Sequence, residues 1–155
     1  MKLYLAQHAQ AAAKDVDPQR PLTERGRRDI RKVAAFIKPL DIAVDYLWHS
    51  GKKRAAQTAE ALAEVVKTNK PPAARDRLGP LDGVTPLADE LASAAGNIMI
   101  VGHLPFLAKL ASLLLTGLES AESVAFKQGG IVCLGRTDEN RWQVQWMVTP
   151  DLLAD

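Results

Sequence analysis

The sequence predicts an α/β fold in which helices cover both faces of a mostly parallel sheet, giving a three-layer sandwich. Short apolar runs typical of buried strands alternate with stretches of helical periodicity. The run at residues 98–101 is continuously apolar, as expected for a strand covered on both faces. The last two apolar runs are separated only by residues 136–141, and such a short link suits an antiparallel hairpin better than a crossover.

The first half of the chain is predicted to contain two strands, each followed by a helix. Residues 3–6 form the first strand. After a polar loop, Thr23 is a suitable N-cap for a helix whose apolar side chains recur on one face, and Pro39 ends that helix. Residues 44–48 form the second strand, and residues 53–67 form a helix with a small apolar inner face.

The second half is predicted to complete the sheet. Its elements are, in order, a loop over residues 75–86, a short helix over 87–95, a strand over 98–101, a helix with Pro105 in its first turn, and strands over 131–135 and 142–148. In a regular last strand Trp142 and Trp146 share one face, and we expect both in the core.

Composition indicates a single globular domain over residues 1–155. Apolar residues make up 47% of the chain and charged residues 25%, and the formal net charge of +2 is too small to indicate a nucleic-acid partner. The only cysteine, Cys133, cannot form an internal disulfide, as is usual in a reducing cytoplasm. The apolar stretch 98–115 is interrupted by His103, Pro105 and Lys109, which argues against a membrane span. We therefore expect a cytoplasmic monomer that binds neither membrane nor nucleic acid.

Polar residues follow three of the predicted strands. Gln7 and His8 follow the first strand, Ser50 lies between the second strand and the helix that holds Arg54, and His103 follows the strand at residues 98–101. Ligands of open α/β sheets bind beyond the carboxyl ends of the strands. We therefore expect these residues to converge at one edge of the sheet.

The residue types at this edge favour phosphoryl transfer. The start of the second helix supplies free backbone N–H groups and a positive dipole end, which suit a phosphate group, and Arg54 can add a bidentate guanidinium. A neutral imidazole such as that of His8 is a competent nucleophile, and that of His103 can hydrogen-bond the transferring group. A nucleophile and positioned donors for an anion are what phosphoryl transfer mainly requires.

Four sequence segments carry a resemblance to a known family. Singly they are weak signals, but they occur in the family's order over nearly the whole chain. They are Gln7-His8-Ala9, Arg20-Pro21-Leu22-Thr23 with Gly26, Ser50 with Arg54-Ala55 and Gln57-Thr58, and Gly102-His103-Leu104-Pro105. The pattern resembles the histidine phosphatase superfamily, and within it the phosphohistidine phosphatases of the SixA type.

The resemblance implies a phosphoglycerate mutase-like fold and a specific activity. His8 would take the phosphoryl group as a transient phosphohistidine, which water then hydrolyses, with no metal and no other cofactor. Arg54 and His103 would complete the catalytic set, and Gln7, Arg20, Ser50, Arg54 and His103 would bind the phosphate. The substrate would be a phosphorylated protein, most simply one carrying phosphohistidine, or a small phosphorylated metabolite.

Two positions depart from the family pattern, which has Arg-His-Gly where this chain has Gln7-His8-Ala9. Glutamine keeps an N–H donor but lacks the charge and the fork of arginine, and loss of one such donor can lower a rate by about 10²–10³. Ala9 fits only if this position does not require a positive φ. The alternative function is therefore a phosphate-binding or regulatory protein of the same fold with weakened chemistry.

Other polar residues leave further hypotheses open. Asp82 is the one nearby acid that could protonate a leaving group, and without such an acid a P–N substrate is favoured over an alkyl phosphate. His49 is assigned a structural role. Five basic residues of the first helix form an exposed face that could alternatively contact nucleic acid, namely Arg25, Arg27, Arg28, Arg31 and Lys32.

Overall fold

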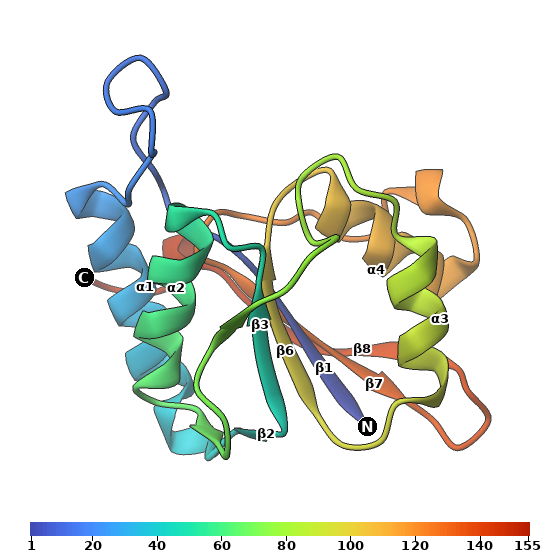
Figure 1. Ribbon diagram of the computed structural model, residues 1–155. Coiled ribbons are helices and arrows are strands. Elements are labelled where there is room, and N and C mark those ends of the chain that lie inside the picture. Colours follow the sequence, from blue (N-terminus) through green and yellow to red (C-terminus); the bar gives the residue numbers. More distant parts are fainter.

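The computed structural model describes residues 1–155 and confirms the α/β class (Figure 1). Six strands form one sheet in the order β5-β3-β6-β1-β7-β8. Parallel pairing joins β5, β3, β6 and β1, whereas β7 runs antiparallel to both of its neighbours. The sheet is thus mostly parallel, and β7 and β8 form the expected hairpin.

The strands of this sheet are β1 (Lys2–Gln7), β3 (Tyr46–His49), β5 (Ala73–Ala74), β6 (Ile98–Gly102), β7 (Ile131–Arg136) and β8 (Trp142–Val148). The helices are α1 (Glu24–Ile37), α2 (Lys53–Ala63), α3 (Thr85–Ser93) and α4 (Phe106–Thr116), with single 3₁₀ turns η1 (Lys38–Leu40), η2 (Glu119–Ala121) and η3 (Pro150–Leu152). None of these helices has the length and apolarity needed to cross a membrane.

Helices cover both faces of the sheet, so the molecule has two hydrophobic cores (Figure 1). One core lies under α1 and α2, and the other lies under α3 and α4. The central strand β1 alternates between them, with Tyr4 and Ala6 in the first and Leu3 and Leu5 in the second. Because both faces are covered, this strand is apolar at every position from 3 to 6.

The start of α1 confirms the predicted cap. The Oγ1 atom of Thr23 accepts a hydrogen bond from the backbone N–H of Gly26 at 3.0 Å. Gly26 lies against the chain that follows β1, where an added Cβ atom would be 2.1 Å from the backbone oxygen of Gln10. Only glycine allows this approach, which joins the first turn of α1 to the segment after His8.

The region around the second strand differs from the sequence prediction. The predicted strand at residues 44–48 is divided, because Asp45 leaves the ladder and exchanges hydrogen bonds with Asn97. Residues before it form β2 (Ala43–Val44), which pairs in parallel with β4 (Lys67–Thr68) in a separate two-stranded sheet. This pairing also shortens the predicted 53–67 helix, since α2 ends at Ala63 and residue 67 is in β4.

The prediction that Trp142 and Trp146 share one face of the last strand is wrong. Along β7, Cys133 pairs with Trp146 whereas Leu134 pairs with Val144, so β8 carries one extra residue between the two pairs. Such a bulge reverses the alternation of side chains beyond it. Trp146 consequently packs on the α1/α2 side, 6.0 Å from the ring of Tyr4, and Trp142 packs on the α3/α4 side.

We predict that Gly26→Ala lowers the free energy of unfolding by an amount at the upper end of about 1–3 kcal/mol, because the new methyl group overlaps the carbonyl of Gln10. Urea denaturation would measure this loss. Gly83→Ala is the matched control, since an added Cβ there meets nothing within 4 Å. Equal stability of the two variants would contradict the assignment of Gly26 to a close backbone contact.

Candidate active site

The carboxyl ends of three neighbouring strands meet at one edge of the sheet. Strand β6 lies between β3 and β1, with Gln7 opposite Gly102 and His49 opposite Val101. The three strands are parallel and end at the same level, so the residues that follow them are brought together (Figure 1). Polar groups far apart in the sequence thereby become neighbours.

The two predicted imidazoles lie side by side at this edge. The ring centroids of His8 and His103 are 5.1 Å apart, and the residues are 6% and 2% exposed. The backbone N–H of His8 donates to the carbonyl of Gly102 at 3.0 Å, which extends the β1–β6 ladder by one bond. The spacing of the rings is therefore set by sheet pairing, not by a flexible loop.

The ring of His8 has a defined orientation. Its Nδ1 atom lies 2.7 Å from the carbonyl oxygen of Ala9. Since a carbonyl only accepts, Nδ1 carries the proton of the neutral ring and Nε2 keeps its lone pair. Burial lowers the pKa of His8; the Ala9 carbonyl opposes this shift, and the charges of Arg54 and Arg20 add to it. The imidazole is accordingly neutral at pH 7.

His103 is held by a serine. Its Nε2 atom is 2.6 Å from the Oγ atom of Ser50, which in turn accepts the backbone N–H of Lys52 at 3.3 Å. The pKa of His103 is lowered to about 3, first by burial and then by His8 and three cationic side chains. Protonation of this ring thus opposes the folded state, so its contribution to stability falls as pH decreases from 6.5 toward about 3.

Two arginines supply the positive charge of the site. Arg54 lies in the first turn of α2, where the helix dipole disfavours a cation that has no anionic ligand. Burial, and then the charge of Arg20, lower its pKa. Arg20 comes from the loop before α1, adopts a left-handed φ of 50°, and donates from Nε to the carbonyl of Ala12 at 3.0 Å. Its charge also lowers the pKa values of both imidazoles.

The site gathers buried polar atoms that have no hydrogen-bond partner within the protein. The chain has four such side-chain atoms, and three of them belong to predicted site residues: Gln7 Oε1, Arg54 Nε and His103 Nδ1. Buried polar groups are almost always paired, because an unmade hydrogen bond costs about 1–3 kcal/mol. Arg54 Nε can only donate and has no acceptor among these cationic groups, which indicates a place for an anionic ligand, whereas Gln7 Oε1 can only accept and does not contribute to binding one.

The two departures from the family pattern differ in consequence. Ala9 is fully buried and is not among the non-glycine residues with positive φ, so this position does not require glycine. Gln7 is 7% exposed and brings a neutral amide into the positively charged site. The family's arginine would add a further cation there.

Supporting residues of the site carried little signal in the sequence. In the sequence Gln57 and Thr58 stand out only as parts of a motif, and Gln10 lies outside every motif. The Oε1 atoms of Gln57 and Gln10 accept hydrogen bonds from the Leu22 backbone N–H at 2.8 Å and from the Thr23 hydroxyl at 2.7 Å. Their partners are distant in sequence, so motif spacing alone points to Gln57 and Thr58, and nothing in the sequence points to Gln10.

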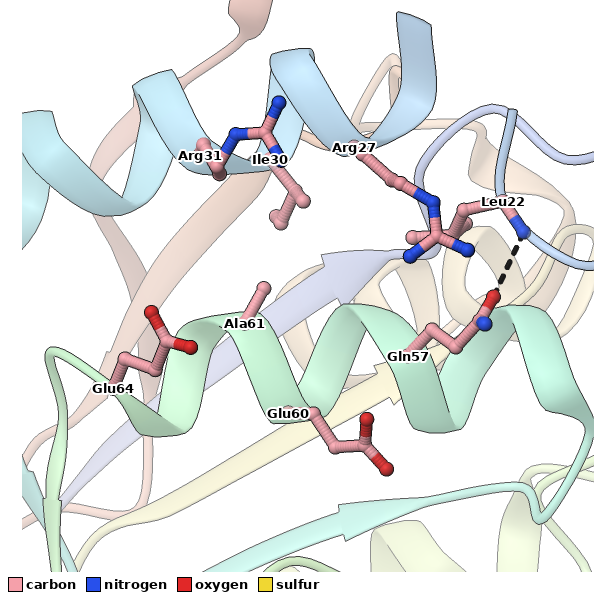
Figure 2. A pocket seen from close by; sticks show the side chains of 8 residues that line it. All are labelled: Leu22, Arg27, Ile30, Arg31, Gln57, Glu60, Ala61 and Glu64. Atoms are coloured by element: carbon pink, nitrogen blue, oxygen red, sulfur yellow. Dashed lines mark hydrogen bonds between the residues drawn. The ribbon is translucent and has the colours of Figure 1, made fainter. Parts of the chain in front are cut away.

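A separate pocket lies on the outer surface between α1 and α2 (Figure 2). The Gln57–Leu22 hydrogen bond crosses one end of it, and Arg27, Arg31, Glu60 and Glu64 are among its other lining residues. It contains none of the predicted site residues. Its charged side chains are exposed, so it offers no buried polar group with which to select a ligand.

The remaining candidates have local structural roles. The Nδ1 atom of His49 accepts the backbone N–H of Gly51 at 3.0 Å, in agreement with the structural role predicted for it. Asp82 is exposed and accepts the backbone N–H of Gly79 at 2.7 Å within its own loop. Four of the five basic residues predicted for the exposed face of α1 are exposed, whereas Lys32 is partly buried and pairs with Asp155 at 2.8 Å. No group of three His, Cys, Asp or Glu side chains is arranged to hold a metal ion.

Comparison with known proteins identifies the class of this fold and site. The sequence pattern of the histidine phosphatase superfamily (branch 1) matches residues 3–83, more than half of the chain. The chain belongs to this superfamily, and its membership supports phosphatase activity. No curated protein matches it in sequence.

Solved structures with the same fold include SixA proteins, which confirms the resemblance seen in the motifs. The protein histidine phosphatase SixA, solved with tungstate, superposes with a TM-score of 0.85 at 21% identity, covering 99% of this chain and 100% of that one. A protein assigned as a phosphohistidine phosphatase SixA from Agrobacterium tumefaciens has a TM-score of 0.76 at 24% identity, covering 96% and 97%.

Other neighbours act on different phosphate compounds. The alpha-ribazole phosphatase from Shigella flexneri superposes with a TM-score of 0.70 at 17% identity, covering 97% of each chain. A phosphoserine phosphatase mutant from Entamoeba histolytica, in complex with phosphoserine, has a TM-score of 0.72 at 16% identity and covers 99% of each chain. At such identities the likeness establishes the phosphoglycerate mutase-like fold, and the substrate has to be argued from the site.

The electrostatics of the site predict that inorganic phosphate raises the pKa values of His8 and His103. In the free protein burial lowers both values below the ordinary 6.5, and the charges of Arg54 and Arg20, which a bound anion would offset, lower them further. Histidine NMR titrations with and without phosphate would measure the change. His49 is the internal control, since no arginine affects its pKa. Unchanged titration of both site histidines would contradict an anion site here.

Proposed function

We propose that this protein is a phosphohistidine phosphatase that works through a covalent phosphohistidine intermediate on His8. One observation supports the proposal most strongly. Two arginines and two neutral imidazoles lie together at a place where buried polar atoms have no hydrogen-bond partner within the protein. We treat residues 1–155 as one domain, since β1 and β7, from the two ends of the chain, pair at the centre of one sheet.

The first step is transfer of the phosphoryl group to the enzyme. The lone pair on Nε2 of His8 attacks phosphorus, an N–P bond forms, and the bond to the leaving group breaks with its electron pair going to that group. The neutral state of the ring and the proton on Nδ1 both leave Nε2 nucleophilic. Arg54 and Arg20 would bind the phosphoryl oxygens, where their charges offset the charge of the transferring group.

The second step is hydrolysis. A water molecule attacks phosphorus, the N–P bond to His8 breaks, and orthophosphate leaves with the protons of that water. The ring of His8 recovers its lone pair on Nε2. In both steps Ser50 would hold the ring of His103 by the hydrogen bond to Nε2, and the amide N–H groups of Gln7 would donate to phosphoryl oxygens.

The charges around the imidazoles favour a P–N substrate. Every charged side chain that shifts the pKa of His8 or His103 is cationic or an imidazole, and none is a carboxylate. The one acid considered, Asp82, bonds to its own loop. A protonated imidazole leaves phosphorus as a neutral molecule without help from an acid, whereas an alkoxide needs a proton. Phosphohistidine, on a protein or as a smaller compound, therefore matches this site.

The proposal predicts a phosphoenzyme labelled at His8. Incubation with a radiolabelled phosphoramidate, rapid quenching in alkali and peptide mapping should place the label on that residue, and His8→Ala should carry none. His49→Ala is the control for loss of a histidine, because the ring of His49 bonds to the backbone of Gly51 and is not the proposed nucleophile, so this variant should still be labelled at His8. Phosphate binding by the natural chain without labelling or turnover would instead favour a phosphate-binding regulatory protein.

The absence of a carboxylate among the charges acting on the imidazoles predicts a ranking of substrates. We expect kcat/KM for a phosphohistidine peptide to exceed that for an alkyl phosphate of similar size, because only the alkyl substrate requires a proton donor. Initial rates on both substrates at pH 7 would decide. Faster turnover of the alkyl phosphate would overturn the assignment to P–N bonds and leave the phosphatase class in place.

A further inference from the structure

We propose that Thr58 is a positioning residue for His8: its hydroxyl group holds Ala9 so that the Ala9 carbonyl keeps the imidazole proton on Nδ1 and the lone pair on Nε2. The inference rests on the proposed function, in which Nε2 is the attacking atom. Thr58 would touch no substrate and would act through Ala9.

The hydroxyl of Thr58 donates one hydrogen bond and accepts another. Thr58 is completely buried. Its Oγ1 atom donates to the backbone carbonyl of Arg54 at 2.8 Å and accepts the backbone N–H of Ala9 at 3.0 Å. The first partner can only accept and the second can only donate, so the direction of the bonds is unambiguous. The other backbone polar group of Ala9, its carbonyl in the next peptide, lies 2.7 Å from Nδ1 of His8, so the position of Ala9 links the two hydrogen bonds.

This connection follows from the position of Thr58 in α2. A threonine hydroxyl in a helix commonly bonds to the carbonyl four residues earlier, here that of Arg54. The remaining lone pair then points away from the helix toward the segment after β1. Ala55 and Ala59, both completely buried, are small enough to let α2 approach the sheet. One side chain thus links the helix turn that carries Arg54 to the residue that orients His8.

The segment after β1 is held from two sides. The peptide group between His8 and Ala9 donates its N–H to Thr58. Its carbonyl accepts, at 3.2 Å, the backbone N–H of Gly129, which also bonds to the carbonyl of Gln7 at 3.0 Å. Without the Thr58 hydroxyl, a fully buried Ala9 would keep an N–H group with no partner, and the segment would shift to satisfy it. The Ala9 carbonyl would then lose its alignment with the imidazole. Loss of the Thr58 hydroxyl would therefore change the direction of the Nε2 lone pair of His8. The guanidinium of Arg54 would still be able to bind an anion.

The test uses Thr58→Val, which keeps the shape of the side chain and removes the hydroxyl, and Thr58→Ser, which keeps the hydroxyl. We expect Thr58→Val to lower kcat by about 10- to 100-fold, as misplacement of a reacting group does, with little change in the affinity for inorganic phosphate. Thr58→Ser should behave as the natural chain. In ¹⁵N-histidine spectra, His8 should change from the Nδ1–H tautomer to a mixture of tautomers in Thr58→Val only.

Thr116→Val is the control, because Thr116 makes the same bond to the carbonyl of Ser112, also at 2.8 Å, at the C-terminal end of α4. This variant should change neither kcat nor the His8 tautomer. If Thr58→Val does not fold, Thr58→Ala removes the same hydroxyl and is measured in the same way. A folded variant without the hydroxyl that retains both the Nδ1–H tautomer and the natural kcat would overturn the inference.

The tautomer measurement also separates this inference from the proposed function. It requires no turnover, so a chain that forms no phosphoenzyme, but in which His8 loses its Nδ1–H tautomer without the Thr58 hydroxyl, would disprove the activity and support the positioning role. Conversely, a labelled His8 with a tautomer that is indifferent to residue 58 would support the activity and disprove the positioning role.

Discussion

The in-register pairing of β6 between β1 and β3 is the constraint on which the rest of the site depends. It places the residues that follow all three strands at one edge of the sheet. The hydrogen bond from the His8 N–H to the Gly102 carbonyl extends the β1–β6 pairing by one residue, to His8 itself. A slip of one residue would turn the side chains of the moved strand to its opposite face, exchanging the two cores as well as displacing an imidazole. Packing on both faces of the sheet therefore protects the geometry of the site.

The electrostatic character of the site follows from burial. Burial lowers the pKa values of both imidazoles, the positive charges of the nearby side chains lower them further, and both rings are therefore neutral. The site thus combines uncharged nitrogen atoms with guanidinium groups whose charge is not balanced by an acid. Such an arrangement is unfavourable for the free protein and is relieved by an anion, which is a physical reason to associate this edge with a phosphoryl group.

The neutral residue at position 7 distinguishes this chain within its superfamily pattern. Gln7 occupies the last position of a buried central strand, and its amide oxygen has no partner in the protein. A third guanidinium in the same volume would increase the repulsion among the cations and lower the histidine pKa values further. The site is therefore less positive than the family pattern implies. The arginines whose charges lower the pKa values of both imidazoles are Arg20 and Arg54.

Local patterns in the sequence were sufficient to predict much of this protein. Apolar runs predicted the strands, the spacing of apolar residues and the Thr23 cap predicted α1, and polar residues after three strands predicted which groups would meet, because burial and the period of each element act over a few neighbouring residues. Only the tertiary structure decided features that depend on a partner distant in sequence. The β2–β4 pairing ends α2 early, and the bulge in β8 places Trp142 and Trp146 on opposite faces of the sheet. The hydroxyl of Thr58 accepts a hydrogen bond from the backbone N–H of Ala9. Each is a choice between nearly equivalent local conformations, and a hydrogen bond or contact from elsewhere in the chain determines it.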